Sequence, residues 1–159
     1  MKQCALFIVF AVLVAVLSPS QRAGATIGGS VESVEADRKA LSALDTTAQP
    51  VARAALGYTV AEINPEATAI REYISPDGVV FGVAWNGPVH PDLTHLLGPY
   101  NDEYINALRQ TPRVHGKRHS RVKTASGLVV ERWGHMRSVK GRAYVPELIP
   151  SGVSVDNIK

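Results

Sequence analysis

The stretch from Arg71 to Trp85 constrains the fold of this chain most, because it has the pattern of two β-strands joined by a tight turn. The turn reads Ser-Pro-Asp-Gly. Pro76 favours the first corner of a type I turn, and Gly78 can adopt the left-handed conformation that closes a bulged hairpin. The strand that follows the turn is apolar in almost every position, so we expect it to be buried on both faces.

The two faces of this second strand differ in size. Strict alternation places large side chains on one face, namely Val79, Phe81, Val83 and Trp85. It places small ones on the other face, namely Val80, Gly82 and Ala84. A small, smooth face allows close approach, so we expect a helix to pack against Gly82 and Ala84.

The remaining elements predict an α+β domain, with an antiparallel sheet of about five strands and two to three helices packed against it. The expected strands of the N-terminal part are residues 58–63, 67–74 and 79–85, which form a meander. In the C-terminal part we expect a strand at residues 128–133, which can continue at residues 135–139 after a bulge or bend at Gly134, and residues 142–145, which pair back after a turn at Lys140-Gly141 and complete a hairpin. The expected helices start at Ser30 or Ser33 and run to Leu44, and then cover residues 92–97 and residues 102–110, the last capped by Asn101. An apolar tail around residues 148–158 is expected to pack along this body.

The first 25 residues have the order of a signal peptide: Lys2, an apolar run from Cys4 to Leu17, and small residues before Thr26. Cleavage is expected after Ala25, with Ser20 as the alternative. The apolar run is shorter than the ~20 residues that span a bilayer. We therefore expect an exported protein, periplasmic or extracellular, whose mature domain covers residues 26–159 and begins with a flexible leader at 26–29. Removal of Cys4 leaves no cysteine for a disulfide.

The charge is distributed unevenly along the chain. Without Lys2 and Arg22, the mature chain has 15 basic and 14 acidic residues, which reduces the net charge from +3 to +1. Residues 111–159 nevertheless contain 10 basic and 3 acidic residues. Residues 111–126 are predicted to be an exposed basic loop in which Lys117, Arg118 and Arg121 form an anion-binding patch. We expect no nucleic-acid partner, because the protein is exported and no aromatic side chains interleave the loop to stack on bases.

Several segments together resemble one bacterial family. They are residues 33–38, 71–85, 91–93, 96–98, 134–137 and 141–146. In this order they are similar to domain of unknown function 2844, a family of exported bacterial proteins, and the likeness covers nearly all of the mature chain. The resemblance implies export and a bacterial source. It transfers no catalytic or binding residue to this chain.

The motifs of enzymes are sparse in this sequence. The chain contains no Gly-x-Ser-x-Gly or His-Glu-x-x-His motif. His90, Asp92 and His95 have the residue types of a metal site, but their spacing fits the start of a helix better. An envelope hydrolase or metal-dependent enzyme using these residues, or His135, remains the alternative function. No cofactor is expected.

Two tryptophans, Trp85 and Trp133, fit core packing better than a binding groove. His135 and Arg137 follow the second of them in a segment with few apolar neighbours, which makes them candidates for binding. We therefore predict a non-enzymatic binding or accessory protein of the cell envelope, with either an envelope protein or an anionic envelope surface as its partner.

Overall fold

The computed structural model describes residues 27–30, 57–63, 68–112 and 118–159. The predicted signal peptide, most of the predicted helix that ends at Leu44, and Lys117 lie outside the described residues. No helix in the described ranges is long and apolar enough to cross a membrane.

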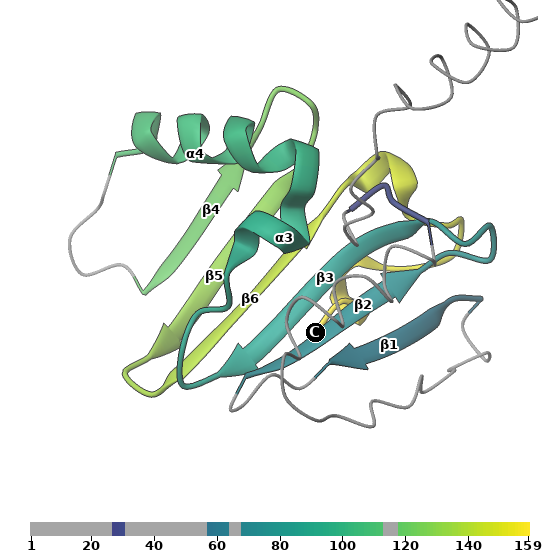
Figure 1. The fold of residues 1–159 in the computed structure, drawn as a ribbon, viewed down its shortest axis with the longest axis horizontal. Helices are drawn as coiled ribbons and strands as arrows, with labels where there is room; N and C mark the ends of the chain where they lie inside the picture. Colours follow the sequence, from purple (N-terminus) through teal and green to yellow (C-terminus); the bar gives the residue numbers. More distant parts are fainter. Residues whose placement is uncertain (1–26, 31–56, 64–67, 113–117) are drawn as a thin grey trace, which may run out of the picture.

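A single antiparallel sheet forms the body of the protein, and it has six strands where about five were predicted (Figure 1). The strands are β1 (Thr59–Ile63), β2 (Ala69–Ile74), β3 (Val80–Gly87), β4 (His119–Lys123), β5 (Val129–His135) and β6 (Ser138–Tyr144). Their order across the sheet is β1-β2-β3-β6-β5-β4. Two three-stranded meanders therefore meet at the β3–β6 pair, and the predicted N-terminal meander and C-terminal hairpin are both present.

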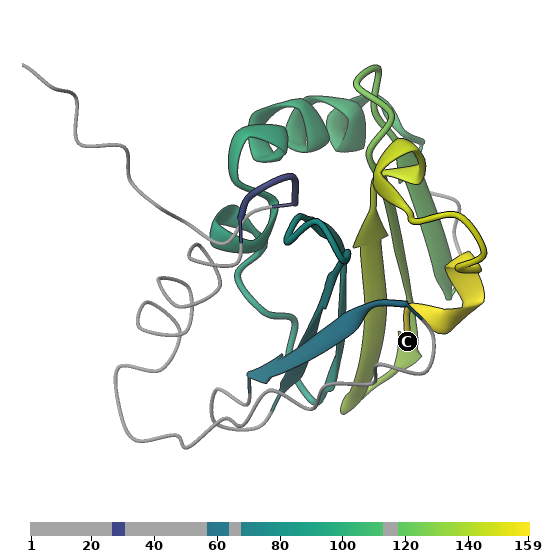
Figure 2. The same cartoon turned by 90° about the vertical axis from the view of Figure 1, so that its right-hand side faces the viewer.

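The helices lie in the crossover from β3 to β4 and cover one face of the sheet (Figures 1 and 2). Helix α3 (Leu93–Leu97) is followed without interruption by a 3-10 turn and by α4 (Asn101–Gln110). In the described residues this is one continuous helical segment, where two to three separate helices were expected. The side chain of Asp92 accepts a hydrogen bond from the Thr94 amide and caps α3, so the helix predicted for residues 92–97 begins one residue later. Asn101 is the first residue of α4, not its cap, because the 3-10 turn already supplies the preceding helical turn.

The segment 111–126, predicted to be a loop, contains strand β4. Val122 is the one residue of this strand whose side chain is buried, and it pairs with Val130 on β5. An edge strand that is covered on one face needs only a few apolar residues, so its sequence did not show the pattern from which strands were predicted. The basic side chains of β4 are exposed, as expected.

The turn of the C-terminal hairpin lies at Met136 and Arg137, not at Lys140-Gly141 as predicted. Gly141 instead pairs with Arg132 inside the strand. A Cβ atom on Gly141 would lie 2.2 Å from Cζ2 of the buried Trp85 ring. The glycine therefore provides room for a side chain of β3 and does not form a turn.

A β-bulge at the start of β3 changes which side chains share a face. Tyr73 pairs with Gly82 and Ile74 pairs with Val80, which leaves Phe81 as the extra residue. Phe81 consequently joins the core on the side of Ala84, and Val80 joins the core beneath the helices. The strict alternation predicted for residues 79–81 was wrong at these positions.

The small face of β3 is covered by the C-terminal tail, residues 145–159, and not by the predicted helix (Figure 2). Ile158 of this tail is fully buried, and its Cδ1 would lie 3.0 Å from a Cβ atom on Gly82. The hydroxyl of Tyr73 donates to the carbonyl oxygen of Lys159 (2.7 Å) and accepts from its amide (2.9 Å). The prediction that an apolar tail packs along the body is confirmed.

Residues 27–29, predicted to belong to a flexible leader, are bound to the sheet. The amide of Gly28 donates to the carbonyl of Val80, and the amide of Val80 donates to the carbonyl of Gly29. Ile27 is 1% exposed and belongs to the core under the helices. An apolar side chain in this short segment was enough to anchor it.

Candidate functional site

Two adjoining pockets, of about 340 and 360 Å³, lie at one end of the sheet, where β4 begins and the β5–β6 hairpin turns. They share the lining residues Arg118, His119, Trp133, Gly134 and His135. The first pocket also includes His90, Ser120, Arg132 and Val139, and the second includes Ser138 and Lys140. We call this region, together with Met136 and Arg137 of the turn, the basic end.

The residues of β5 that line the first pocket come from both faces of the strand. Successive side chains of a strand point to opposite faces. Arg132 lies on the helix side, where its charge reaches Tyr104 of α4 and opposes the rise in the pKa of Tyr104 that burial causes. Trp133 lies on the tail side, where the guanidinium carbon of Arg142 is 5.8 Å from its ring centroid. The basic end therefore offers cations on both faces of the same strand.

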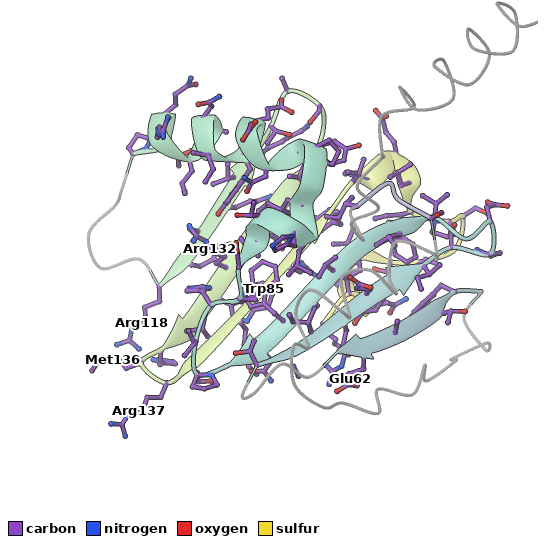
Figure 3. The ribbon with its side chains drawn as sticks, viewed as in Figure 1. Glu62, Trp85, Arg118, Arg132, Met136 and Arg137 are labelled. Carbon is purple, nitrogen blue, oxygen red and sulfur yellow. The ribbon has the colours of Figure 1, made fainter. Side chains whose placement is uncertain are left out.

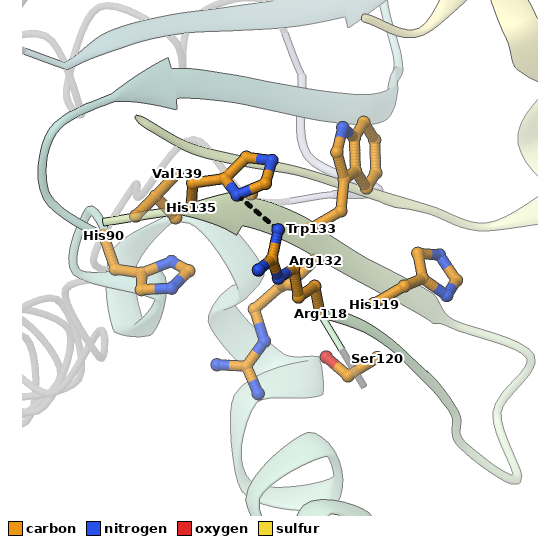
Figure 4. A pocket seen from close by; sticks show the side chains of 9 residues that line it. His90, Arg118, His119, Ser120, Arg132, Trp133, His135 and Val139 are labelled. Carbon is orange, nitrogen blue, oxygen red and sulfur yellow. Dashed lines mark hydrogen bonds between the residues drawn. The ribbon is translucent and has the colours of Figure 1, made fainter. Parts of the chain in front are cut away.

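A hydrogen bond between two side chains joins β4 to β5 at the pocket. Nη1 of Arg118 lies 2.9 Å from Nδ1 of His135 (Figure 4). Because an arginine guanidinium donates and does not accept, Nδ1 of His135 is the acceptor in this contact. This contact depends on strand pairing, since the two residues are 17 positions apart in the sequence.

None of the described residues that line the two pockets is acidic. The pKa of His90 is lowered, first by partial burial and then by the positive charge of Arg132. Within the described part of the chain, Arg132, Arg137 and Lys140 make no ion pair. Positive charge thus accumulates here without a counter-charge from the described residues.

The arginines in the middle of the sheet show the opposite arrangement. Strand pairing aligns one row of side chains across all six strands: Glu62, Arg71, Ala84, Arg142, Glu131 and Arg121. Nε of Arg142 lies 2.6 Å from Glu131, and Nε of Arg121 lies 3.4 Å from the same carboxylate. Arg142 also donates to the carbonyl of Val155 in the tail (2.8 Å). These paired arginines connect neighbouring strands and the tail, whereas in the described residues the cations of the basic end have no acidic partner.

Of the five residues proposed from the sequence for binding, the structure brings two into contact. His135 and Arg118 bond to each other at the pocket. Arg137 lies in the adjacent turn, exposed and with a positive φ of 65°. Arg121 lies outside both pockets and is paired with Glu131, and Lys117 is outside the described residues.

The prediction that both tryptophans lie in the core is confirmed for one of them, and two basic residues of the basic end were not predicted. Trp85 is 2% exposed, which confirms its predicted place in the core. Trp133, for which the same prediction was made, is half-buried and lines both pockets. Arg132 and Lys140 were not singled out. Arg132 directly precedes Trp133 in the sequence, whereas Lys140 pairs with Trp133 from β6 only when the hairpin turn is placed at Met136 and Arg137.

Of the residues named for an enzyme, His90 and His135 both line the first pocket. Asp92 caps α3 and His95 is exposed, and neither lines either of the two pockets. The pKa of Asp92 is lowered, chiefly by its hydrogen bonds from Thr94. Among residues 27–30, 57–63, 68–112 and 118–159, no three His, Cys, Asp or Glu side chains are grouped so as to hold a metal ion.

Comparison with known proteins gives a family and no function. The chain matches none of the curated proteins and none of the solved structures. A family model described as "Protein of unknown function (DUF2844)" matches residues 23–158, which include every described strand and helix. The chain therefore belongs to the DUF2844 family.

Proposed function

We propose that this protein is an exported, non-enzymatic binding or accessory module of the bacterial cell envelope, and that it holds an anionic ligand at the basic end. The observation that carries this proposal is the contrast between the two sets of cations. Arg71, Arg121 and Arg142 each face a glutamate. The cations of the basic end face no acidic side chain in the described residues, although they surround two pockets.

The chemistry of these groups fits a carboxylate or a phosphate. A guanidinium can donate two parallel hydrogen bonds to either anion, and the ammonium of a lysine attracts the anion as a point charge. The half-exposed ring of Trp133 offers an apolar surface beside these donors. Export is supported by the signal-peptide pattern of residues 1–25.

Titration of the ¹⁵N-labelled protein with inorganic phosphate, and separately with a carboxylated polysaccharide, tests the proposal. We expect saturable shifts of the amide signals of Gly134, His135 and Lys140 with at least one of the two anions. Lys140→Gln is expected to weaken binding about tenfold, which corresponds to the loss of one charge-assisted hydrogen bond. Lys123→Gln is the matched control, because Lys123 is an exposed lysine at the far end of β4 and lines neither pocket.

The proposal is wrong if neither anion gives a saturable response at the basic end. It is equally wrong if Lys123→Gln weakens binding as much as Lys140→Gln does, because binding would then depend on the net charge of the protein and not on the residues that line the pockets.

A further inference from the structure

Two large apolar side chains stand exposed in the described part of the protein, and both lie at the same end of the sheet. Met136 is 97% exposed and Val89 is 65% exposed. Met136 occupies the turn between β5 and β6, and Val89 follows the last residue of β3 by two positions. Because Gly87 of β3 pairs with Val139 of β6, both loops leave the sheet at this end.

Basic side chains lie close to Met136 at this end of the sheet. Figure 3 shows Arg118, Met136 and Arg137 directed away from the sheet at its lower left corner. Arg137 has a left-handed backbone, with φ of 65°, which is unfavourable for a residue with a side chain. The turn nevertheless has an arginine at this position, next to the exposed Met136.

We infer that the basic end docks on an anionic lipid surface, with Met136 and Val89 entering the headgroup layer and Arg118, Arg137 and Lys140 facing the lipid phosphates. This inference rests on the proposed anion-binding function and names the class of its partner. The combination of an apolar tip with cations around it is how peripheral proteins hold to anionic membranes. Long basic side chains can also keep their charges among the headgroups while their stems lie against apolar groups.

The shape of the site favours a lipid surface over a soluble ligand. Met136 lies at the tip of a hairpin turn and lines neither pocket. A small ligand held in the pockets would leave this side chain in water. A headgroup layer is fluid and deformable, so it can receive a protruding side chain while its phosphates reach the cations at the pocket rims.

Vesicle co-sedimentation tests the inference with defined lipids. We expect the purified protein to bind vesicles of phosphatidylglycerol and phosphatidylcholine, to bind pure phosphatidylcholine vesicles weakly or not at all, and to dissociate as salt is added. Arg137→Gln should weaken the partition about fivefold, the effect of one cation near an anionic surface. Met136→Ser should weaken it by a similar factor, and Met136→Leu should retain it.

Tryptophan fluorescence gives a second measurement that reports location. Trp133 lines the pockets near the turn, while Trp85 is 2% exposed in the core. Brominated lipids should therefore quench emission from Trp133, and a Trp133→Phe variant should lose the quenching. Lys123→Gln again serves as the control for charge.

Failure of this inference can be distinguished from failure of the proposed function. If the protein binds phosphate or the polysaccharide at the basic end but not the anionic vesicles, the lipid inference is overturned and anion binding stands. If it binds vesicles with Met136→Ser unchanged and without quenching of Trp133, the docking surface lies elsewhere. If it binds neither the soluble anions nor the vesicles, both proposals are wrong.

Discussion

Ile158 provides a direct test of the conclusion that the C-terminal tail is part of the core. Its side chain is fully buried against Gly82 at the centre of the sheet. Ile158→Ala removes three carbon atoms, each worth roughly 0.8 kcal/mol when buried, or about 2.4 kcal/mol together. The cavity left behind adds to this, so we expect the free energy of unfolding to fall by about 3 kcal/mol.

Urea denaturation followed by circular dichroism measures this change. We expect a lower midpoint with an unchanged dependence of the free energy on urea concentration, and a thermal midpoint lower by about 10 °C. Val89→Ala is the control, because Val89 is 65% exposed, and a surface substitution of this kind should change stability by less than about 0.5 kcal/mol.

A loss below about 0.5 kcal/mol for Ile158→Ala would refute the reasoning. The tail would then rest on the sheet without contributing to its stability. In that case Tyr73→Phe, which removes the hydroxyl that bonds both the amide and the carbonyl of Lys159, should also be nearly neutral.

Two further predictions concern Gly141 and His90. Gly141→Ala forces a methyl group against the Trp85 ring, so we expect urea denaturation to show a free energy of unfolding lower by about 1–3 kcal/mol. Ser138→Ala, at an exposed position of the same strand, should leave this free energy nearly unchanged. Equal stability of the two variants would contradict the close approach of Gly141 and Trp85. The pKa of His90 is lower in the folded protein than its ordinary 6.5, so the unfolded chain binds the proton first, and stability should fall as the pH decreases from 6.5 towards the folded pKa. His90→Gln should remove this part of the pH dependence, which is measured from the urea midpoint at pH values above and below 6.5. If the urea midpoint changes equally with pH in the wild-type protein and in the variant, His90 does not contribute.

The sequence predicted the structure correctly where the groups that determine it are neighbours in the chain. The turn after Ser75 forms as predicted: the amide of Gly78 donates to the carbonyl of Ser75, and Gly78 has a φ of 78°. Asp92 caps α3 because its carboxylate reaches an amide two residues later. Such contacts depend on a few adjacent residues, which sequence patterns describe well.

The errors arose where the deciding group lies far away in the sequence. Gly141 resembles a turn residue, yet its role is set by Trp85 on another strand. The extra residue at Phe81 follows from how β3 pairs with β2, and alternation along β3 alone cannot reveal it. Strand β4 has one buried side chain, so its sequence resembles a solvated loop until β5 pairs with it.

The sequence by itself determined the class of the fold, the antiparallel meander around Ser75–Gly78, and the excess of basic residues in the last third of the chain. Only the tertiary structure decided which of those basic residues are neutralised. Strand register places Arg121 and Arg142 beside Glu131, while it brings Arg118 and His135 together at an end of the sheet with no acidic lining. The physical reason is that a charge is compensated by its neighbours in space, and in a sheet those neighbours come from other strands.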